Sequence, residues 1–309
     1  MISTNRPTVL FVHGAFHGPD CFGALISPLK AAQFFGSINN DLKLPSAELN
    51  SSTSLQQDVD VLRAKVLQVL DGSTVANGPR EGSDCVVVMH SYGAVPAAEA
   101  LRGLSRSERG AGRTAVVKMV YLSCNIPKVG DSVVGQLTAW AEERGLPADL
   151  PLEQLVRCEI FPYSSIDAHL VDGQDNGALK FTGAADVFYN GLSENQQASL
   201  MESLSTQSAA SVSITFISFT DNYTDLTNRA LTTPLKGSVG SMAYNMIPGW
   251  YLVCKNDNIL PEAFQRECIR VVGDGMERVE DVDTGHSSFM IVPEVVADFI
   301  VRAAKSANS

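Results

Sequence analysis

A serine that directly follows an apolar run is the strongest chemical signal in the sequence. Residues 85–89 form a continuous apolar, β-branched run, Ser91 comes just after it, and a helical pattern begins at about residue 95. This order is typical of a nucleophile elbow, in which a sharp turn exposes the serine hydroxyl. Gly93 supplies one of the small residues that the turn needs, although Met89 stands where the motif usually has glycine. A serine that only caps a helix would give the same local pattern.

A serine hydroxyl needs a histidine to accept its proton and an acid to orient that histidine. Of the five histidines, His286 follows the last predicted strand, where a loop can bring its imidazole to the serine; a loop histidine without a catalytic role is the alternative. Asp257 follows the strand-like residues 251–254. It gives the chain order Ser, Asp, His that is expected when the serine lies on such an elbow. Asp281 and Asp283, on or beside the last strand, are the alternatives to Asp257.

The first loop, residues 13–18, is predicted to supply part of an oxyanion hole. Its glycines let the backbone approach a substrate, and backbone amides must face the charge that develops on the carbonyl oxygen. We expect the amides of Ala15 and Tyr92 to be the two donors. His13 and His17 are four residues apart, a spacing that could hold a metal on a helix. The loop is interrupted by glycine and lacks the glutamate of an H-E-x-x-H motif, so no metal is expected.

Short apolar strands alternate with helical patterns in the first part of the chain and again at its end. Because parallel neighbours need crossover connections, this alternation predicts an α/β fold with a mostly parallel central sheet flanked by helices. The predicted strands are 8–12, 42–44, 85–89, 115–122, 250–254 and 277–282, and the predicted helices are 19–35, 54–70, 95–104, 261–271 and 294–304. Residues 71–84 are expected to form a surface loop.

The alternation stops between residues 125 and 246. This block holds only helical pieces at 134–143 and 195–204, aromatic-rich loops and a Ser/Thr-rich run. We therefore predict a core formed by 1–124 and 247–309 and an inserted lid, or cap, at 125–246 that folds over the elbow. Candidates for the substrate pocket come from the first loop and from the lid, although each aromatic among them could instead only attach the lid to the core. These candidates are Phe16, His17, Phe161, Tyr163, Phe188 and Tyr189.

With these pieces placed, the chain resembles the α/β-hydrolase superfamily, and within it the branch of plant methylesterases and hydroxynitrile lyases. The resemblance is carried by residues 9–18, by the elbow at 90–93 and by residues 251–265. It implies the α/β-hydrolase fold, and it implies the same catalytic set that the motifs predict. That set consists of Ser91 as nucleophile, Asp257 as acid, His286 as base, and the Ala15 and Tyr92 amides as oxyanion donors.

Two departures from this branch bear on the reaction. The lyases carry a threonine where this chain has Gly14, and a lysine directly after the catalytic histidine, where this chain has Ser287. Without that cation, the negative charge of a leaving cyanide ion would have no compensating positive charge in the site. We therefore expect ester cleavage and no lyase activity. The insertion is longer than in the plant enzymes. Similar long insertions are familiar among microbial hydrolases, some of which act beside polyketide pathways. The substrate is therefore expected to be a metabolite of that kind.

Composition limits the class of protein. The chain has 309 residues, of which 45% are hydrophobic and 18% charged, values typical of a globular protein. A net charge of −11 has the wrong sign for a nucleic-acid partner. The six cysteines are spread singly, as expected of thiols in a reducing compartment, and no apolar stretch is long enough for a membrane span. We expect a cytoplasmic protein that acts neither on nucleic acid nor at a membrane.

The sequence thus predicts a serine hydrolase that cleaves a carboxylic ester, lactone or thioester of a small hydrophobic metabolite through an acyl-enzyme, with no metal or organic cofactor. Two alternatives stay open. One is an acyl-transfer or macrolactonising thioesterase that acts on a polyketide-type chain, with an acyl-carrier protein or a polyketide synthase as partner. The other is a small-molecule receptor on the same fold, although an intact triad argues against it.

Overall fold

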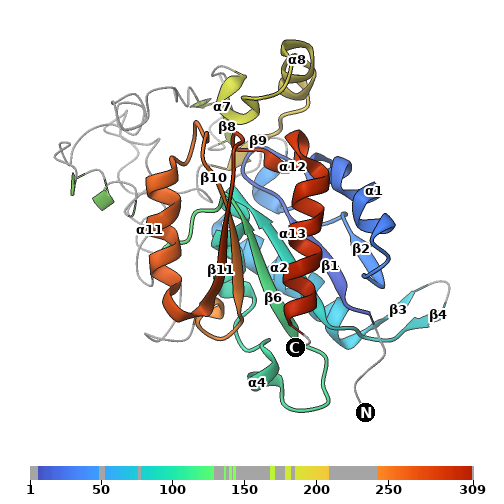
Figure 1. Ribbon diagram of the computed structural model, residues 1–309. Helices are drawn as coiled ribbons and strands as arrows, with labels where there is room; N and C mark the ends of the chain where they lie inside the picture. The colour runs from blue at the N-terminus through green and yellow to red at the C-terminus, as the bar shows by residue number, and fades with distance from the viewer. Residues whose placement is uncertain are drawn as a thin grey trace.

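Six strands, all parallel, form the central sheet, in the order β11-β10-β6-β5-β1-β2 (Figure 1). The strands are β1 (Thr8–Val12), β2 (Ser37–Asn39), β5 (Cys85–His90), β6 (Val116–Leu122), β10 (Gly249–Cys254) and β11 (Met276–Val282). The computed structural model describes residues 6–48, 53–75, 78–128, 136, 139–140, 142–143, 168–170, 178–181, 185–208 and 242–307.

Helices cover both faces of this sheet. On one face α2 and α3 pack with α11, and on the other face α1 packs with α12 and α13. The helices are α1 (Gly23–Ala31), α2 (Leu55–Asp71), α3 (Ala94–Ala100), α4 (Arg106–Arg109), α11 (Glu262–Val272), α12 (Ser288–Ile291) and α13 (Pro293–Ser306). Short 3-10 turns are η1 (Pro19–Phe22), η2 (Pro45–Ala47), η3 (Ser91–Gly93), η4 (Ala243–Asn245) and η5 (Gly273–Gly275).

The continuous apolar runs of the inner strands arise because both faces of the sheet are covered. In β1, Val9 and Phe11 pack into one core, whereas Leu10 and Val12 pack into the other. This division follows from the alternation of side chains along a strand. A polar residue is tolerated in such a strand only with a partner. Lys118 of β6 is almost completely buried, and its ammonium donates to Glu277 of β11 at 2.5 Å.

The predicted α/β fold is confirmed, and one predicted strand is wrong. The second strand of the sheet is Ser37–Asn39, whereas residues 42–44 form no strand. Leu42 and Leu44 are buried, which explains the apolar pattern. The amide of Leu44, however, donates to His13 Nε2 at 3.1 Å, so a side chain rather than a neighbouring strand satisfies it. The predicted loop at 71–84 contains a short antiparallel hairpin, β3 (Ser73–Val75) with β4 (Gly78–Arg80).

The segment between β6 and β10, which are neighbours in the sheet, contains the predicted lid. Its described parts include an antiparallel sheet, in the order β7-β8-β9, and two helices that lie beyond one end of the central sheet (Figure 1). These elements are β7 (Ala168–Leu170), β8 (Ala178–Phe181), α7 (Asp186–Tyr189), α8 (Glu194–Glu202) and β9 (Thr206–Ser208). The helix predicted at 195–204 corresponds to α8, whereas most of the one predicted at 134–143 lies outside the described residues. Within the described part of the chain, no helix is both long and apolar enough to span a membrane.

Candidate active site

Ser91 directly follows β5 and begins the turn η3 in a strained conformation. Its φ of +50° falls in the left-handed region, which non-glycine residues adopt at a cost and which is enriched at functional sites. The turn approaches the end of β1 so closely that a Cβ on Gly93 would lie 2.6 Å from the carbonyl oxygen of Val12. Met89 is fully buried in the core, so its side chain does not obstruct the turn. The local sequence therefore forms an elbow with Ser91 at its tip.

His286 and Asp257 form a buried pair at the carboxyl ends of the last two strands. Asp257 follows β10 and His286 follows β11, and His286 Nδ1 lies 2.7 Å from Asp257 Oδ2. The side chains of both residues are completely buried. A carboxylate only accepts hydrogen bonds, so the proton of the neutral imidazole is on Nδ1 and Nε2 is the acceptor. Nε2 is buried and has no hydrogen-bond partner among the described residues.

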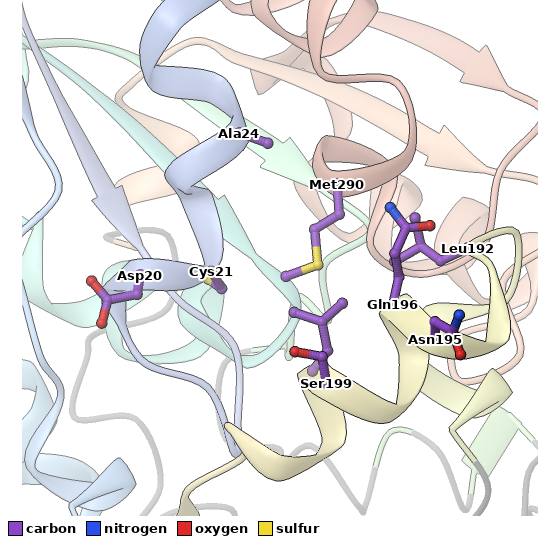
Figure 2. Close-up of a pocket in the computed structure, with 9 residues that line it drawn as sticks. Asp20, Cys21, Ala24, Leu192, Asn195, Gln196, Ser199 and Met290 are labelled. Atoms are coloured by element: carbon purple, nitrogen blue, oxygen red, sulfur yellow. The ribbon is translucent and has the colours of Figure 1, made fainter.

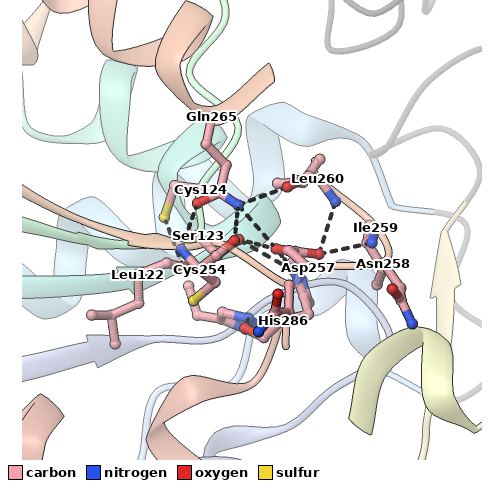
Figure 3. A network of polar contacts seen from close by, with 12 residues as sticks. Leu122, Ser123, Cys124, Cys254, Asp257, Asn258, Ile259, Leu260, Gln265 and His286 are labelled. Atoms are coloured by element: carbon pink, nitrogen blue, oxygen red, sulfur yellow. Dashed lines mark hydrogen bonds and ion pairs between the residues drawn. The ribbon is translucent and has the colours of Figure 1, made fainter. Parts of the chain in front are cut away.

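The carboxylate of Asp257 is itself held by donors from three parts of the chain, namely its own loop, the residue after β6 and α11 (Figure 3). The amides of Ile259 and Leu260 donate to its Oδ1 at 2.7 and 2.9 Å. Ser123 Oγ donates to Oδ2, and Gln265 Nε2 lies 3.4 Å from the same oxygen. These contacts fix the plane of the carboxylate and hence the plane of the imidazole that it binds.

Sequence reasoning missed Ser123 and Gln265. Ser123 follows β6 directly and has a φ of +46°, the same left-handed conformation as Ser91. A polar residue just after a buried strand, at the sheet edge where Asp257 also lies, was the available signal. Gln265 carried none, because it stands in α11 and becomes important only through the packing of that helix on β10. There its amide bonds both the N–H and the C=O of Cys254, at 3.0 and 2.9 Å.

The two alternative acids are engaged elsewhere. Asp281 accepts from Arg266 at 2.8 Å, and Asp283 pairs with Lys255 at 2.5 Å. The side chains of the two aspartates are 42% and 78% exposed, in contrast to the buried Asp257. Of the three candidates, Asp257 is the one that contacts His286.

The first loop runs beside the elbow. A Cβ on Gly14 would lie 3.1 Å from the Cβ of Ser91 and 3.0 Å from His90 Nδ1, so a larger residue here would require these neighbours to shift slightly. Ala15 follows Gly14, and Tyr92 follows Ser91, so both predicted oxyanion residues flank this contact. The next amide in the loop, that of Phe16, already donates to Gln207 Oε1 at 3.2 Å.

The histidines of the first loop are neutral structural groups. His17 Nδ1 lies 2.7 Å from the carbonyl oxygen of Ala15, and Nε2 accepts from the hydroxyl of Tyr189 at 2.9 Å. His13 Nδ1 lies 2.9 Å from the carbonyl oxygen of Gly14. Burial lowers the pKa of each of the two histidines to about 4. Their ring nitrogens are thus engaged with separate partners rather than directed at a common point.

A further histidine, His90, packs directly against His286, the predicted catalytic base. The rings of His90 and His286 are 4.6 Å apart, and His90 Nε2 lies 3.3 Å from the carbonyl oxygen of His286. Burial, followed by the neighbouring histidines, lowers the pKa of His90 well below its ordinary value. A neutral His90 adds no positive charge beside His286.

An aromatic cluster lies against this group. Phe16, Phe181 and Phe188 are buried together, with Phe16 and Phe188 6.2 Å apart and Phe181 and Phe188 4.6 Å apart. Phe188 is also 6.2 Å from the ring of His286. The pocket candidates Phe16, His17, Phe188 and Tyr189 are thus brought together. The other two, Phe161 and Tyr163, lie outside the described residues.

A groove of about 480 Å³ opens where the inserted segment meets the core (Figure 2). Its core side is formed by η1, α1 and Met290 of α12, and its other side by α8. The lining residues are Asp20, Cys21, Ala24, Leu192, Asn195, Gln196, Ser199, Leu200 and Met290. Met290 and Leu200 also pack against the aromatic cluster. The groove therefore shares lining residues with the surroundings of the aromatic cluster, whereas Phe188 and His286 are not among the residues that line it.

Comparison with known proteins identifies the family of this chain. The profile of the alpha/beta hydrolase family matches residues 9–299. The chain belongs to this family. The match begins in β1 and ends in α13, so it spans all elements that carry the candidate residues of this alpha/beta hydrolase, and the predicted resemblance to the superfamily is confirmed.

One curated fungal protein and several solved structures resemble this alpha/beta hydrolase. Over 305 residues it is 26% identical to "Alpha/beta hydrolase nvfD" of Aspergillus novofumigatus, which covers 98% of each chain. Among solved structures it is similar to polyneuridine aldehyde esterase, with a TM-score of 0.65, 15% identity, and coverage of 96% of this chain and 99% of the other. It is also similar to the methylesterase protein MES16 from Arabidopsis, with a TM-score of 0.61, 17% identity, and coverage of 97% and 99%. The two structural likenesses establish the fold.

Proposed function

We propose that this alpha/beta hydrolase cleaves a carboxylic ester, lactone or thioester of a small hydrophobic metabolite through an acyl-enzyme on Ser91. The observation that carries the proposal is the buried contact of 2.7 Å between His286 Nδ1 and Asp257, which leaves Nε2 as an open acceptor. Ser91 supports it as a half-buried serine at the tip of a strained elbow. A serine, an oriented histidine and an acid are the groups that nucleophilic acyl transfer requires.

The roles follow from the chemistry of each group. Ser91 Oγ attacks the carbonyl carbon while His286 Nε2 accepts its proton, and the carbonyl electron pair moves onto the oxygen. The amides of Ala15 and Tyr92 donate to that oxyanion. On collapse, the alcohol or thiol leaves with the proton from His286, and water then releases the acid by the same steps. Asp257 stays ionised and stabilises the imidazolium.

The substrate class rests on the aromatic cluster and on the names of the relatives. Phe16, Phe181 and Phe188 offer apolar surface beside His286, which favours an apolar acyl or alcohol portion. The structural neighbours carry the names esterase and methylesterase, which agrees with an oxygen ester as the bond cleaved.

The test combines labelling with turnover. The wild-type protein is treated with a fluorophosphonate probe, the labelled peptide is identified by mass spectrometry, and hydrolysis of p-nitrophenyl esters of increasing acyl length is measured. Ser91→Ala should abolish labelling and lower kcat by several orders of magnitude. Ser203→Ala, which removes an exposed hydroxyl at the end of α8, should change neither. Labelling of another serine with Ser91 untouched would refute the proposal.

A further inference from the structure

The two predicted oxyanion residues are connected by a buried group of polar side chains. The group consists of Asp58 in α2, Ser46 in η2 and Gln207 in β9, and we call it the Asp58 network. All three residues are completely buried. One end of the network contacts Tyr92, and the other end contacts Phe16, the residue after Ala15. It therefore joins the elbow to the first loop by a route that does not pass through Ser91.

The hydrogen bonds of the network form a continuous chain. Tyr92 Oη donates to Asp58 Oδ2 at 2.7 Å. Ser46 donates to the same carboxylate twice, from Oγ to Oδ2 at 2.5 Å and from its backbone amide to Oδ1 at 2.9 Å. Gln207 Nε2 donates to Ser46 Oγ at 2.8 Å, and Gln207 Oε1 accepts from the Phe16 amide at 3.2 Å. Asp58 is thus the common acceptor, which Tyr92 reaches from one side and which Phe16 reaches from the other side through Gln207 and Ser46.

The network ends on a peptide that is held on both sides. The peptide between Ala15 and Phe16 donates its N–H to Gln207, and its oxygen accepts from His17 Nδ1 at 2.7 Å. The carbonyl of Phe16 in turn accepts from the amide of Ser205 at 2.8 Å. Phe16 has a φ of +62°, so this tightly turned conformation needs such contacts to persist. Rotation of the peptide, which would redirect the backbone at Ala15, requires the loss of several hydrogen bonds.

Asp58 depends on these donors. A buried carboxylate is costly unless it is paired or well hydrogen-bonded, and no cation pairs with Asp58 within the described ranges. Burial raises the pKa of Asp58, while its bonds to Ser46 and Tyr92 act in the opposite direction. A role confined to attaching α2 to η2 would need only the two bonds from Ser46. The third bond goes to the residue whose amide is a predicted oxyanion donor.

We propose that Asp58 and Gln207 are positioning residues that hold the Ala15 and Tyr92 amides in the arrangement that binds the oxyanion. This inference rests on the proposed function. Donors that are oriented in advance stabilise the transition state without reorganisation, so a small displacement lowers the rate of the chemical step more than it weakens substrate binding. Because Gln207 belongs to the inserted segment, that segment contributes to the catalytic geometry and not only to the pocket.

The experiment removes the two ends of the network separately and together. Tyr92→Phe deletes only the hydroxyl that bonds Asp58, and Gln207→Leu deletes the amide that bonds Phe16 and Ser46. Each should lower kcat for p-nitrophenyl acetate roughly tenfold with little change in KM. The double variant should lose less than the product of the two factors, because both changes break one network. Tyr121→Phe is the matched control, since its buried hydroxyl donates to the sulfur of Met119 and belongs to no part of the Asp58 network.

A second readout separates positioning from general destabilisation. When Ser91 Oγ adds to the carbonyl carbon of a trifluoromethyl ketone, the serine proton moves to His286 and the carbonyl electron pair moves to the oxygen. The resulting oxyanion lies where the amides donate. The affinity of this ketone should fall by the same factor as kcat in the network variants and stay unchanged in Tyr121→Phe. If a variant unfolds, as judged by circular dichroism, Ser46→Ala provides a smaller break in the same chain.

The outcomes are distinct. If the variants are folded and their kcat and inhibitor affinity stay within twofold of the wild type, Asp58 and Gln207 serve stability alone and the inference is wrong. In that case the wild type still hydrolyses the ester and Ser91 is still labelled by the fluorophosphonate. If the wild type shows neither turnover nor labelling, the proposed function itself fails, and this inference fails with it.

Discussion

At the scale of single residues, environment assigns different roles to chemically identical side chains. Asp257 and Asp283 are both close in sequence to a strand end, yet one is buried against an imidazole and the other pairs with a surface lysine. The backbone amides of Ile259 and Leu260 bind Asp257 before any substrate arrives. A carboxylate held in this way orients its histidine, whereas an exposed ion pair contributes little to geometry or stability.

This difference predicts the effect of removing each charge. Asp257→Asn should lower kcat on the order of 10⁴-fold, because an amide N–H facing His286 Nδ1 favours the tautomer in which Nε2 carries the proton and cannot accept another. Asp283→Asn should leave kcat within about twofold, since it breaks only a surface pair. Steady-state kinetics with a p-nitrophenyl ester measures both. A large loss in Asp283→Asn with little loss in Asp257→Asn would move the acid to the last strand.

At the scale of elements, the strands and helices that line the two cores could be predicted because burial leaves a periodic pattern in the sequence. The runs that became β1, β5, β6 and β10 are apolar for a physical reason, namely a sheet covered on both faces. The same pattern led to a wrong position for β2, because Leu42 and Leu44 are buried although they lie in a loop. Burial alone does not distinguish a strand from a loop whose amides are satisfied by a side chain such as His13.

The candidate site was predictable where chain order and local turn chemistry determine it, as for Ser91, Asp257 and His286. The contacts that support this site could not be predicted from the sequence, because they join elements that are distant along the chain. Asp58 and Gln207 are 149 residues apart in the sequence, yet both reach Ser46. No local pattern distinguishes such residues from an ordinary polar residue on a helix or strand. Only the packed fold shows that they are buried and partnered.

The contact between the elbow and β1 gives a prediction at the same scale. In Gly93→Ala, the new Cβ would meet the carbonyl oxygens of Val12 and His13 at 2.6 and 2.8 Å, so β1 and the loop behind it must shift. We expect a loss of about 1–3 kcal/mol in the free energy of unfolding and a clear fall in kcat. Urea unfolding and ester hydrolysis measure the two effects.

Gly23→Ala is the matched control for that substitution. Gly23 begins α1 with a helical φ of −51°, and a Cβ there would meet nothing within 4 Å. Alanine at this position should be neutral or stabilise by up to about 1 kcal/mol. If Gly93→Ala were as stable and as active as Gly23→Ala, the close contact between the elbow and β1 would not be needed for folding or for activity.

At the scale of the whole molecule, the buried histidines make stability depend on pH. His13 and His17 keep a pKa of about 4 in the folded protein, against an ordinary value of 6.5 when unfolded. Between these values the unfolded chain binds more protons than the folded one. The free energy of unfolding should therefore be largest above pH 6.5 and fall as the pH drops toward 4, by about 3 kcal/mol for each histidine.

Urea denaturation at intervals between pH 7.5 and 4 measures this dependence. In His17→Gln one of the titrating groups is removed, so the difference in stability between this variant and the wild type should itself shrink as the pH falls. A difference that is independent of pH would show that His17 contributes nothing to the acid sensitivity.

The adjacency of β6 and β10 in the sheet also bears on how the chain is synthesised. When β6 leaves the ribosome, β2, β1, β5 and β6 can already pair, but the strand that will cover β6 follows only after the whole inserted segment. Until then the nascent sheet has an apolar open edge, the kind of surface that promotes association between chains. Lys118 is the single charged residue in that strand, and its partner Glu277 arrives later still. Slow translation of the inserted segment would thus lengthen the interval during which this edge can associate with other chains.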